Sequence, residues 1–196
     1  MNHLAHLFLS QPTVESRVGN LLGDFAQGLD VDALSDQVRV GLYNHRAVDA
    51  FTDHHPDVLA CKPLFSAQRR RFSGIALDVL FDHYLLRHWA RFTRIPKHLF
   101  IDSVYQDLAA GRELMPSRMA VTTARMVEHD WFNAYAHLDN IGFALDRIAG
   151  RIRFPNQFEG VIEEIRVLDA ELEARFLRFF PELVEDNRRR GTPSAE

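Results

Sequence analysis

The chain of 196 residues is poor in several features, and each scarcity excludes a class of protein. A single cysteine, Cys61, rules out an internal disulfide framework and a cysteine-based zinc finger, so the chain fits a reducing cytoplasm. No apolar run reaches the length of a membrane span, and the N-terminal segment lacks a basic leader and a small-residue cleavage site. We therefore expect a cytoplasmic protein without a membrane span.

Lysine is also scarce, since arginine supplies 21 of the 23 basic residues. The formal net charge of -4 argues against general nucleic-acid binding, which requires a strongly basic face. A local basic run is nevertheless present at Arg69, Arg70 and Arg71. Because guanidinium groups suit carboxylates and phosphates, this run is either a solvated surface or a docking patch for an acidic partner.

Several short motifs and repeat patterns are missing as well. The chain contains no H-E-x-x-H of zinc proteases, no E-x-x-H of di-iron bundles, no G-x-G-x-x-G and no P-loop. Alternating strand patterns are rare, whereas helical periodicity dominates and 46% of the residues are hydrophobic. The sequence therefore predicts one compact, all-α helical bundle over residues 1–184, followed by a frayed tail at 185–196.

The prolines and the helical periodicity together divide the chain into segments. Proline suits the first turn of a helix and disfavours helix in the residue before it, so Pro56, Pro96 and Pro116 mark expected starts. We predict helices near residues 2–10, 14–27, 33–54, 57–69, 74–93, 97–111, 117–136, 139–149 and 158–179.

Two of these helices carry acids on a face that should be apolar. Residues four apart share a helix face, which places Asp78 and Asp82 on an otherwise hydrophobic side and aligns His45, Asp49 and Asp53 in one stripe. An isolated buried carboxylate is costly, so such acids are usually paired, hydrogen-bonded or bound to a metal ion. The two stripes therefore indicate nitrogen and oxygen ligands from two helices.

The same spacing recurs twice near the N-terminus, in Asn2 with His6 and in Asn20 with Asp24. Four helices can thus converge on one polar pocket, in which the residues either cap and cross-link helices or share a cation. A set of histidine and oxygen ligands favours manganese or magnesium, with zinc or iron also possible. Such a site typically binds phosphate and activates water.

Five ordered segments strongly resemble the acyl carrier protein phosphodiesterase family: MNHLAHL, GNLLGDF, HRAVDAFTD, RRRF and SGIALDVLFDHYLLRHW. The resemblance runs from Met1 to about Trp89 and continues more loosely through the C-terminal half. It implies an all-α, manganese-dependent enzyme from a non-canonical branch of the HD phosphohydrolases. Such an enzyme removes 4′-phosphopantetheine from holo acyl carrier protein and leaves the apo protein.

The resemblance also implies roles for particular residues. It falls on Asn2, His6, Asn20, Asp24, His45, Arg46, Asp49, Asp53, Asp78, Asp82 and His83. The preferred metal ligands are Asp24, His45, Asp82 and His83. Further ligands or orienting groups are His6, Asp49 and Asp78. Because the second cluster reads Asp82-His83, it reverses the usual His-Asp order of the HD enzymes.

The remaining roles concern the phosphate, the leaving group and the partner protein. Arg46 would steady the phosphate through a bidentate contact, and His6 or Asp53 would protonate the departing serine oxygen. The run Arg69–Arg71 would dock the acidic carrier protein and make activity sensitive to salt.

Two other functions remain open at this level. One is a related phosphohydrolase acting on a nucleotide or another small phosphodiester, which activity on free nucleotides would support. The other is a non-catalytic helical binding protein, in which the polar residues make only structural hydrogen bonds. Failure to bind manganese at micromolar concentration would favour this last interpretation.

Overall fold

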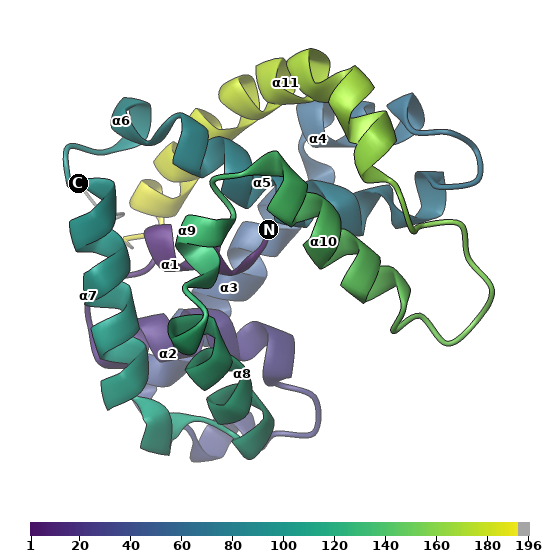
Figure 1. The fold of residues 1–196 in the computed structure, drawn as a ribbon. Helices are drawn as coiled ribbons and strands as arrows, with labels where there is room; N and C mark the ends of the chain where they lie inside the picture. Colours follow the sequence, from purple (N-terminus) through teal and green to yellow (C-terminus); the bar gives the residue numbers. More distant parts are fainter. Residues whose placement is uncertain (192–196) are drawn as a thin grey trace.

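The computed structural model describes residues 1–191, which form helices joined by turns and loops, with no strand among them (Figure 1). The α-helices are α1 (His3–Phe8), α2 (Val14–Leu22), α3 (Asp36–His54), α4 (Pro56–Cys61), α5 (Ser73–Arg87), α6 (Trp89–Phe92), α7 (Lys97–Ala110), α8 (Ser117–Glu128), α9 (Trp131–Ala134), α10 (Leu138–Ala149) and α11 (Ile162–Arg189). Short 3-10 turns are η1 (Gly23–Phe25), η2 (Val31–Ala33), η3 (Lys62–Leu64), η4 (Arg70–Phe72) and η5 (Arg112–Leu114). The predicted all-α fold is confirmed.

Local signals in the sequence explain several helix boundaries. Pro56 is the first residue of α4, and Pro96 and Pro116 directly precede α7 and α8. Thr13 begins α2 by accepting a hydrogen bond of 3.3 Å from the backbone N–H of Ser16. These residues satisfy or remove the donors that the first turn of a helix leaves unpaired.

Other predicted helices are shorter in the structure. The segment expected at 57–69 ends as α4 at Cys61 and continues in 3-10 turns. The segment expected at 117–136 is divided into α8 and α9 by Asp130, whose φ of 46° lies in the left-handed region. A left-handed residue cannot continue a right-handed helix, so the chain changes direction there.

The C-terminal helix is longer than its periodicity predicts, and it arches over the fold in Figure 1. Phe176, Phe179 and Phe180 of α11 are fully buried, and the Phe176 ring centroid lies 5.3 Å from that of Phe81 in α5. The tail predicted at 185–196 begins inside this helix. Asn187 is fully buried and donates to the Leu9 carbonyl oxygen at 3.0 Å, so residues 185–189 belong to the fold. The part of that tail at 192–196 lies outside the described residues.

Helices α2 and α3 approach each other closely through two glycines. A Cβ atom at Gly19 would lie 2.2 Å from the Val38 carbonyl oxygen, and one at Gly41 would lie 2.7 Å from that of Ser16. Any larger residue would separate the backbones. The contact therefore places the end of α2 and η1 directly against the middle of α3.

We expect Gly19→Ala to lower the free energy of unfolding by about 1–3 kcal/mol or more, because the new methyl group meets rigid backbone. Gly74→Ala in α5 is the matched control, since a Cβ there has no neighbour within 4 Å. That control should gain up to about 1 kcal/mol from the better helix propensity of alanine. Urea denaturation of both variants measures the difference, and equal stabilities would contradict the close-packing explanation.

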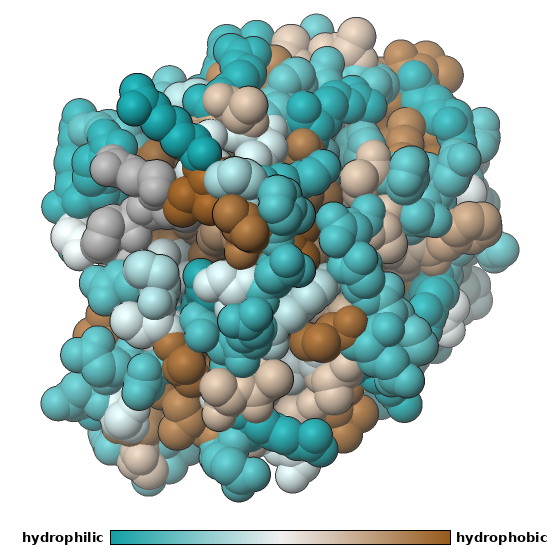
Figure 2. Space-filling model, turned by 60° about the vertical axis from the view of Figure 1, so that its left-hand side comes forward, coloured by the Kyte–Doolittle hydropathy of each residue, from teal (hydrophilic) through white to brown (hydrophobic). Residues whose placement is uncertain are grey.

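The surface shown in Figure 2 is mostly hydrophilic, with hydrophobic residues in small separate groups. Within residues 1–191, no helix combines the length and the apolar composition needed to cross a membrane.

Candidate metal centre

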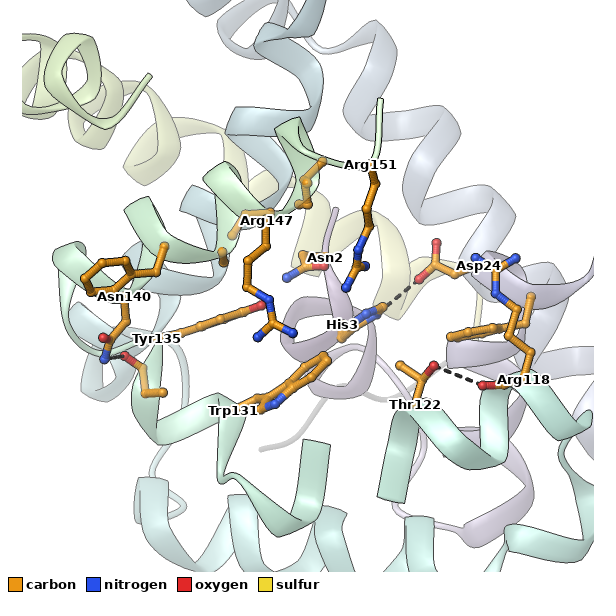
Figure 3. Close-up of a pocket in the computed structure, with 16 residues that line it drawn as sticks. Asn2, His3, Asp24, Arg118, Thr122, Trp131, Tyr135, Asn140, Arg147 and Arg151 are labelled. Atoms are coloured by element: carbon orange, nitrogen blue, oxygen red, sulfur yellow. Dashed lines mark hydrogen bonds and ion pairs between the residues drawn. The ribbon is translucent and has the colours of Figure 1, made fainter. Parts of the chain in front are cut away.

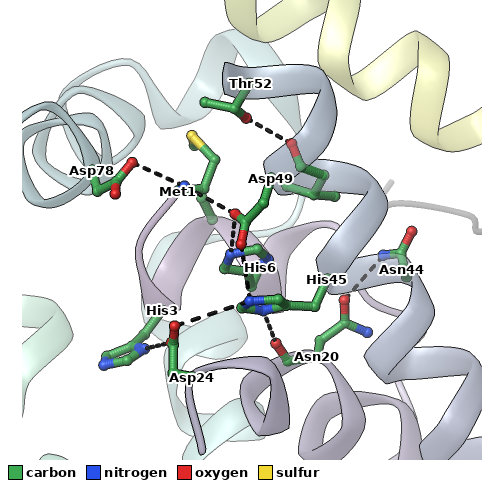
Figure 4. A network of polar contacts seen from close by, with 12 residues as sticks. Met1, His3, His6, Asn20, Asp24, Asn44, His45, Asp49, Thr52 and Asp78 are labelled. Carbon is green, nitrogen blue, oxygen red and sulfur yellow. Dashed lines mark hydrogen bonds and ion pairs between the residues drawn. The ribbon is translucent and has the colours of Figure 1, made fainter. Parts of the chain in front are cut away.

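Three side chains from two helices converge beneath the N-terminus (Figure 4). His6 comes from α1, whereas His45 and Asp49 occupy successive turns of α3. The Nε2 atom of His6 lies 3.2 Å from Asp49 Oδ1, and that of His45 lies 3.0 Å from Asp49 Oδ2. The two imidazole rings are stacked, with centroids 3.8 Å apart. One potential ligand atom from each residue lies within 4.8 Å of the others.

Burial and charge give these groups the protonation states of metal ligands. His6 is fully buried, and this burial lowers its pKa to about 4. Burial opposes ionisation of Asp49, but the close contacts with His45 and His6 hold the pKa of this carboxyl well below its ordinary value. At neutral pH the site therefore contains a neutral imidazole and an ionised carboxylate.

The orientation of His45 leaves a lone pair directed at the cluster. Its Nδ1 lies 2.7 Å from the backbone carbonyl oxygen of Asn20, which can only accept a hydrogen bond, so Nδ1 carries a proton. A histidine held in this way presents Nε2 to a metal ion. Burial alone would lower the pKa of His45, but the effect of Asp49 is larger and the pKa is raised. The Asp49 carboxylate faces Nε2 and attracts a proton or a cation to it.

The surroundings of His6 also indicate a cation. Within residues 1–191, neither ring nitrogen of His6 has a hydrogen-bond partner of good geometry, although the ring is fully buried. The Asp49 carboxylate faces a ring nitrogen of each stacked imidazole, and one divalent ion can bind all three groups. The donor set of His6, His45 and Asp49 therefore fits a metal ion.

Two further acids border the cluster. Asp24 in η1 lies 3.1 Å from His3 Nδ1 and 4.0 Å from His45 Nε2. Burial raises the pKa of Asp24, but the contacts with His3 outweigh it and bring the pKa below its ordinary value. On the other side, the α-amino group of Met1 lies 3.2 Å from Asp49 and 3.0 Å from Asp78.

Asp82 and His83, which the sequence predicts as metal ligands, lie outside this cluster. Asp82 is fully buried, and its two oxygens accept the backbone N–H groups of Leu4 and Ala5, both at 3.0 Å. It thus satisfies unpaired donors in the first turn of α1. His83 Nδ1 lies 2.8 Å from the Tyr135 carbonyl oxygen and Nε2 lies 3.0 Å from an Arg87 nitrogen, so both ring nitrogens are engaged.

We expect Asp82→Ala to destabilise the protein by at least about 2 kcal/mol, because two buried N–H groups lose their acceptor. Asp82→Asn retains one acceptor oxygen, so its free energy of unfolding should fall by less. If Asp82 acts only by holding α1, the folded Asp82→Asn protein should bind Mn²⁺ nearly as tightly as the unsubstituted protein. Calorimetric Mn²⁺ titration measures this, and a loss of stoichiometric binding by folded Asp82→Asn would instead make Asp82 a ligand.

Comparison with known proteins identifies the family. A family model described as acyl carrier protein phosphodiesterase matches residues 1–183. The chain is 33% identical to the acyl carrier protein phosphodiesterase of Pectobacterium atrosepticum and 32% identical to that of Serratia proteamaculans, each covering 94% of this chain and 96% of the relative. It is 31% identical to the protein of that name from Salmonella agona, over 97% of this chain and 100% of the relative. The chain belongs to the acyl carrier protein phosphodiesterase family. No solved structure matches the chain.

Arg46 and Asp53, which the family resemblance also implicates, are exposed on α3. The Arg46 guanidinium lies 5.8 Å from the ring centroid of Tyr43.

The Arg69–Arg71 run is held by the chain itself. Arg69 donates to the Gln157 and Glu159 carbonyl oxygens and pairs with Glu164 at 3.0 Å. Arg70 donates to the carbonyl oxygens of Pro63 and Phe65, and Arg71 lies over the Phe72 and Phe154 rings. These contacts tie η4 to neighbouring segments, including the loop before α11.

His3 is a residue beside the cluster that helix-face reasoning does not single out. It lies three residues before His6, within the segment MNHLAHL, and its Nδ1 faces Asp24. His3 and Asp24 also line a cavity of about 430 Å³ beside the cluster (Figure 3). The spacing of His3 and His6 on one helical turn is the signal that points to both histidines.

Proposed function

We propose that this protein hydrolyses holo acyl carrier protein to the apo protein and 4′-phosphopantetheine. The observation that carries the proposal is the cluster of His6, His45 and Asp49, in a chain that belongs to the acyl carrier protein phosphodiesterase family over residues 1–183. The adjoining cavity offers room for a small group beside these residues.

His6, His45 and Asp49 would hold a divalent cation, for which we propose Mn²⁺ because mixed imidazole and carboxylate ligands suit it. Such an ion would polarise a phosphoryl oxygen and make a water molecule more acidic. The chain prepares the ligands in advance: burial keeps His6 neutral, and the Asn20 carbonyl fixes the ring orientation of His45.

The reaction breaks the bond between phosphorus and the serine oxygen of the carrier. Water supplies the hydroxyl group that joins phosphorus, and the serine oxygen takes up a proton. Because a serine alkoxide is a poor leaving group, a side chain must deliver that proton. We assign this role to His3, whose Nδ1 contacts Asp24 at 3.1 Å and whose other ring nitrogen is left for the substrate. Asp24 would orient the ring and stabilise its charged form.

We expect His3→Gln to lower kcat by about 100-fold or more, in the range typical of general acid catalysis, while Mn²⁺ affinity changes little. Steady-state kinetics and Mn²⁺ titration separate the effect on turnover from the effect on metal binding. Unchanged kcat would remove His3 from the mechanism.

The experiment that tests the proposed function is intact-mass analysis of purified holo acyl carrier protein incubated with this protein and Mn²⁺. We expect the carrier to lose the mass of its phosphopantetheine group, and a chelator to prevent the loss. Retention of the holo mass under conditions in which the protein is folded and binds Mn²⁺ would contradict the proposal.

A further inference from the structure

The cavity beside the candidate metal centre has an unusual charge. Three arginines line it: Arg118 in α8, Arg147 in α10 and Arg151 just after α10. Figure 3 shows Arg147 and Arg151 extending into the cavity from one side, whereas Arg118 belongs to the opposite wall. Asp24 is the one acid among the described residues of the lining, and it already contacts His3.

These arginines have no acidic partner among the residues that the structure describes. Within residues 1–191, none of the three guanidinium groups forms an ion pair, although Arg118 lies 6.0 Å from the Phe25 ring centroid. Arg118, Arg147 and Arg151 are exposed, whereas the buried Arg17 bonds Asp107 at 2.6 Å. Three unpaired guanidinium groups around one concavity attract an anion, and their forked geometry suits the oxygens of a phosphate.

The rest of the lining is largely apolar. Trp131 of α9 and Phe143 and Ile148 of α10 contribute to it, and Phe143 is 67% exposed. The cavity volume of about 430 Å³ lies within the range of roughly 300–1,000 Å³ found for small-molecule sites. A concavity of this size takes a slender group carrying a phosphate at one end and alkyl and amide groups along its length.

We propose that this cavity receives the 4′-phosphopantetheine arm, an inference that rests on the proposed function. The guanidinium groups of Arg118, Arg147 and Arg151 hold the phosphate beside His3 and Asp24. Trp131 and Phe143 pack against the pantetheine chain. Hydrolysis converts a phosphodiester with one negative charge into a phosphomonoester with up to two, so the arginines hold the released arm more firmly than the esterified arm. The product therefore inhibits the enzyme.

The test is calorimetric titration of the full-length, Mn²⁺-loaded protein with 4′-phosphopantetheine, pantetheine and AMP. The phosphate-bearing arm should bind at least about tenfold more tightly than pantetheine, as expected for charge-assisted hydrogen bonds. In Arg147→Gln and Arg151→Gln this preference should fall by about tenfold, while pantetheine affinity and Mn²⁺ affinity stay unchanged. Phe143→Ser should weaken the binding of 4′-phosphopantetheine and of pantetheine by the same factor.

The matched control is Arg125→Gln, which changes an exposed arginine of α8 that is not part of the cavity lining. It should retain the phosphate preference and the KM of the unsubstituted protein. The inference is overturned if the cavity variants keep the full preference, or if AMP binds as tightly as 4′-phosphopantetheine and depends on the same arginines.

This experiment separates the inference from the proposed function. If the unsubstituted protein leaves holo carrier intact but binds 4′-phosphopantetheine through these arginines, the hydrolase proposal fails and the cavity assignment stands. If it converts holo carrier and the arginine variants match it in KM and in phosphate preference, the cavity assignment alone fails.

Discussion

Asp49→Asn is expected to abolish tight Mn²⁺ binding and to lower the rate of holo carrier hydrolysis by more than about 100-fold. The loss should exceed the roughly 10- to 100-fold cost of removing a residue that only orients a ligand. The reason is geometric: within the part of the chain that the structure describes, Asp49 is the one acid that pairs with both His6 and His45, at 3.2 Å and 3.0 Å. Its carboxylate also supplies the negative charge that a divalent ion requires in the cluster.

Asp102→Asn provides the control for this prediction, since it makes the same chemical change at an exposed carboxylate of α7 outside the cluster. Intact-mass kinetics and Mn²⁺ titration should give values close to those of the unsubstituted protein. Far-ultraviolet circular dichroism establishes that both variants are folded. A folded Asp49→Asn protein that hydrolyses holo carrier within twofold of the normal rate would exclude Asp49 from the centre.

The second large effect is expected from Gly23→Ala, which alters no ligand. A Cβ atom at Gly23 would lie 2.0 Å from Cδ2 and 2.2 Å from Nε2 of His45. The His45 ring cannot simply move aside, because Asn20 holds its Nδ1 at 2.7 Å and Asp49 faces its Nε2. We therefore expect the ring to leave its position. Mn²⁺ affinity and turnover should then each fall by about 100-fold, as they do when a group that orients a metal ligand is lost.

The fold should tolerate this substitution better than the metal centre does. Gly23 has a φ of -53°, which alanine adopts readily, so the backbone itself is not strained. Gly74→Ala, with an unobstructed Cβ position, should leave turnover unchanged. Thermal unfolding, Mn²⁺ titration and kinetics on both variants distinguish a displaced ligand from a general loss of stability. Normal Mn²⁺ binding by Gly23→Ala would contradict the position assigned to His45.

Helix propensity and proline positions predicted most helix starts, but tertiary packing decided how far the helices extend. The periodicity predicts that the last helix ends near residue 179, and a proline such as Pro181 removes a donor and crowds the preceding turn of a helix. In the structure α11 passes through Pro181 and ends at Arg189. Burial of Phe179, Phe180 and Leu183 on one face outweighs the cost of the proline.

In the candidate metal centre, too, the sequence predicted part of the arrangement and tertiary packing decided the rest. Helix-face spacing placed His6, His45 and Asp49 among the polar residues turned toward the interior, and the structure brings these three together. The same spacing placed Asp82 in the interior, where it is fully buried, but its partners are the backbone N–H groups of α1. Spacing along one helix gives the direction of a side chain, whereas the group that meets it belongs to another segment.

The sequence by itself determined the helical class, the family and the group of polar residues from which the centre is built. Only the tertiary structure decided which of them meet, because the close crossing at Gly19 and Gly41 sets α2 against α3 and α1 carries His6 onto His45. It also decided where Arg118, Arg147 and Arg151 gather, since α8 and α10 adjoin one cavity. Contacts between distant segments depend on how the whole core packs, which no local pattern encodes.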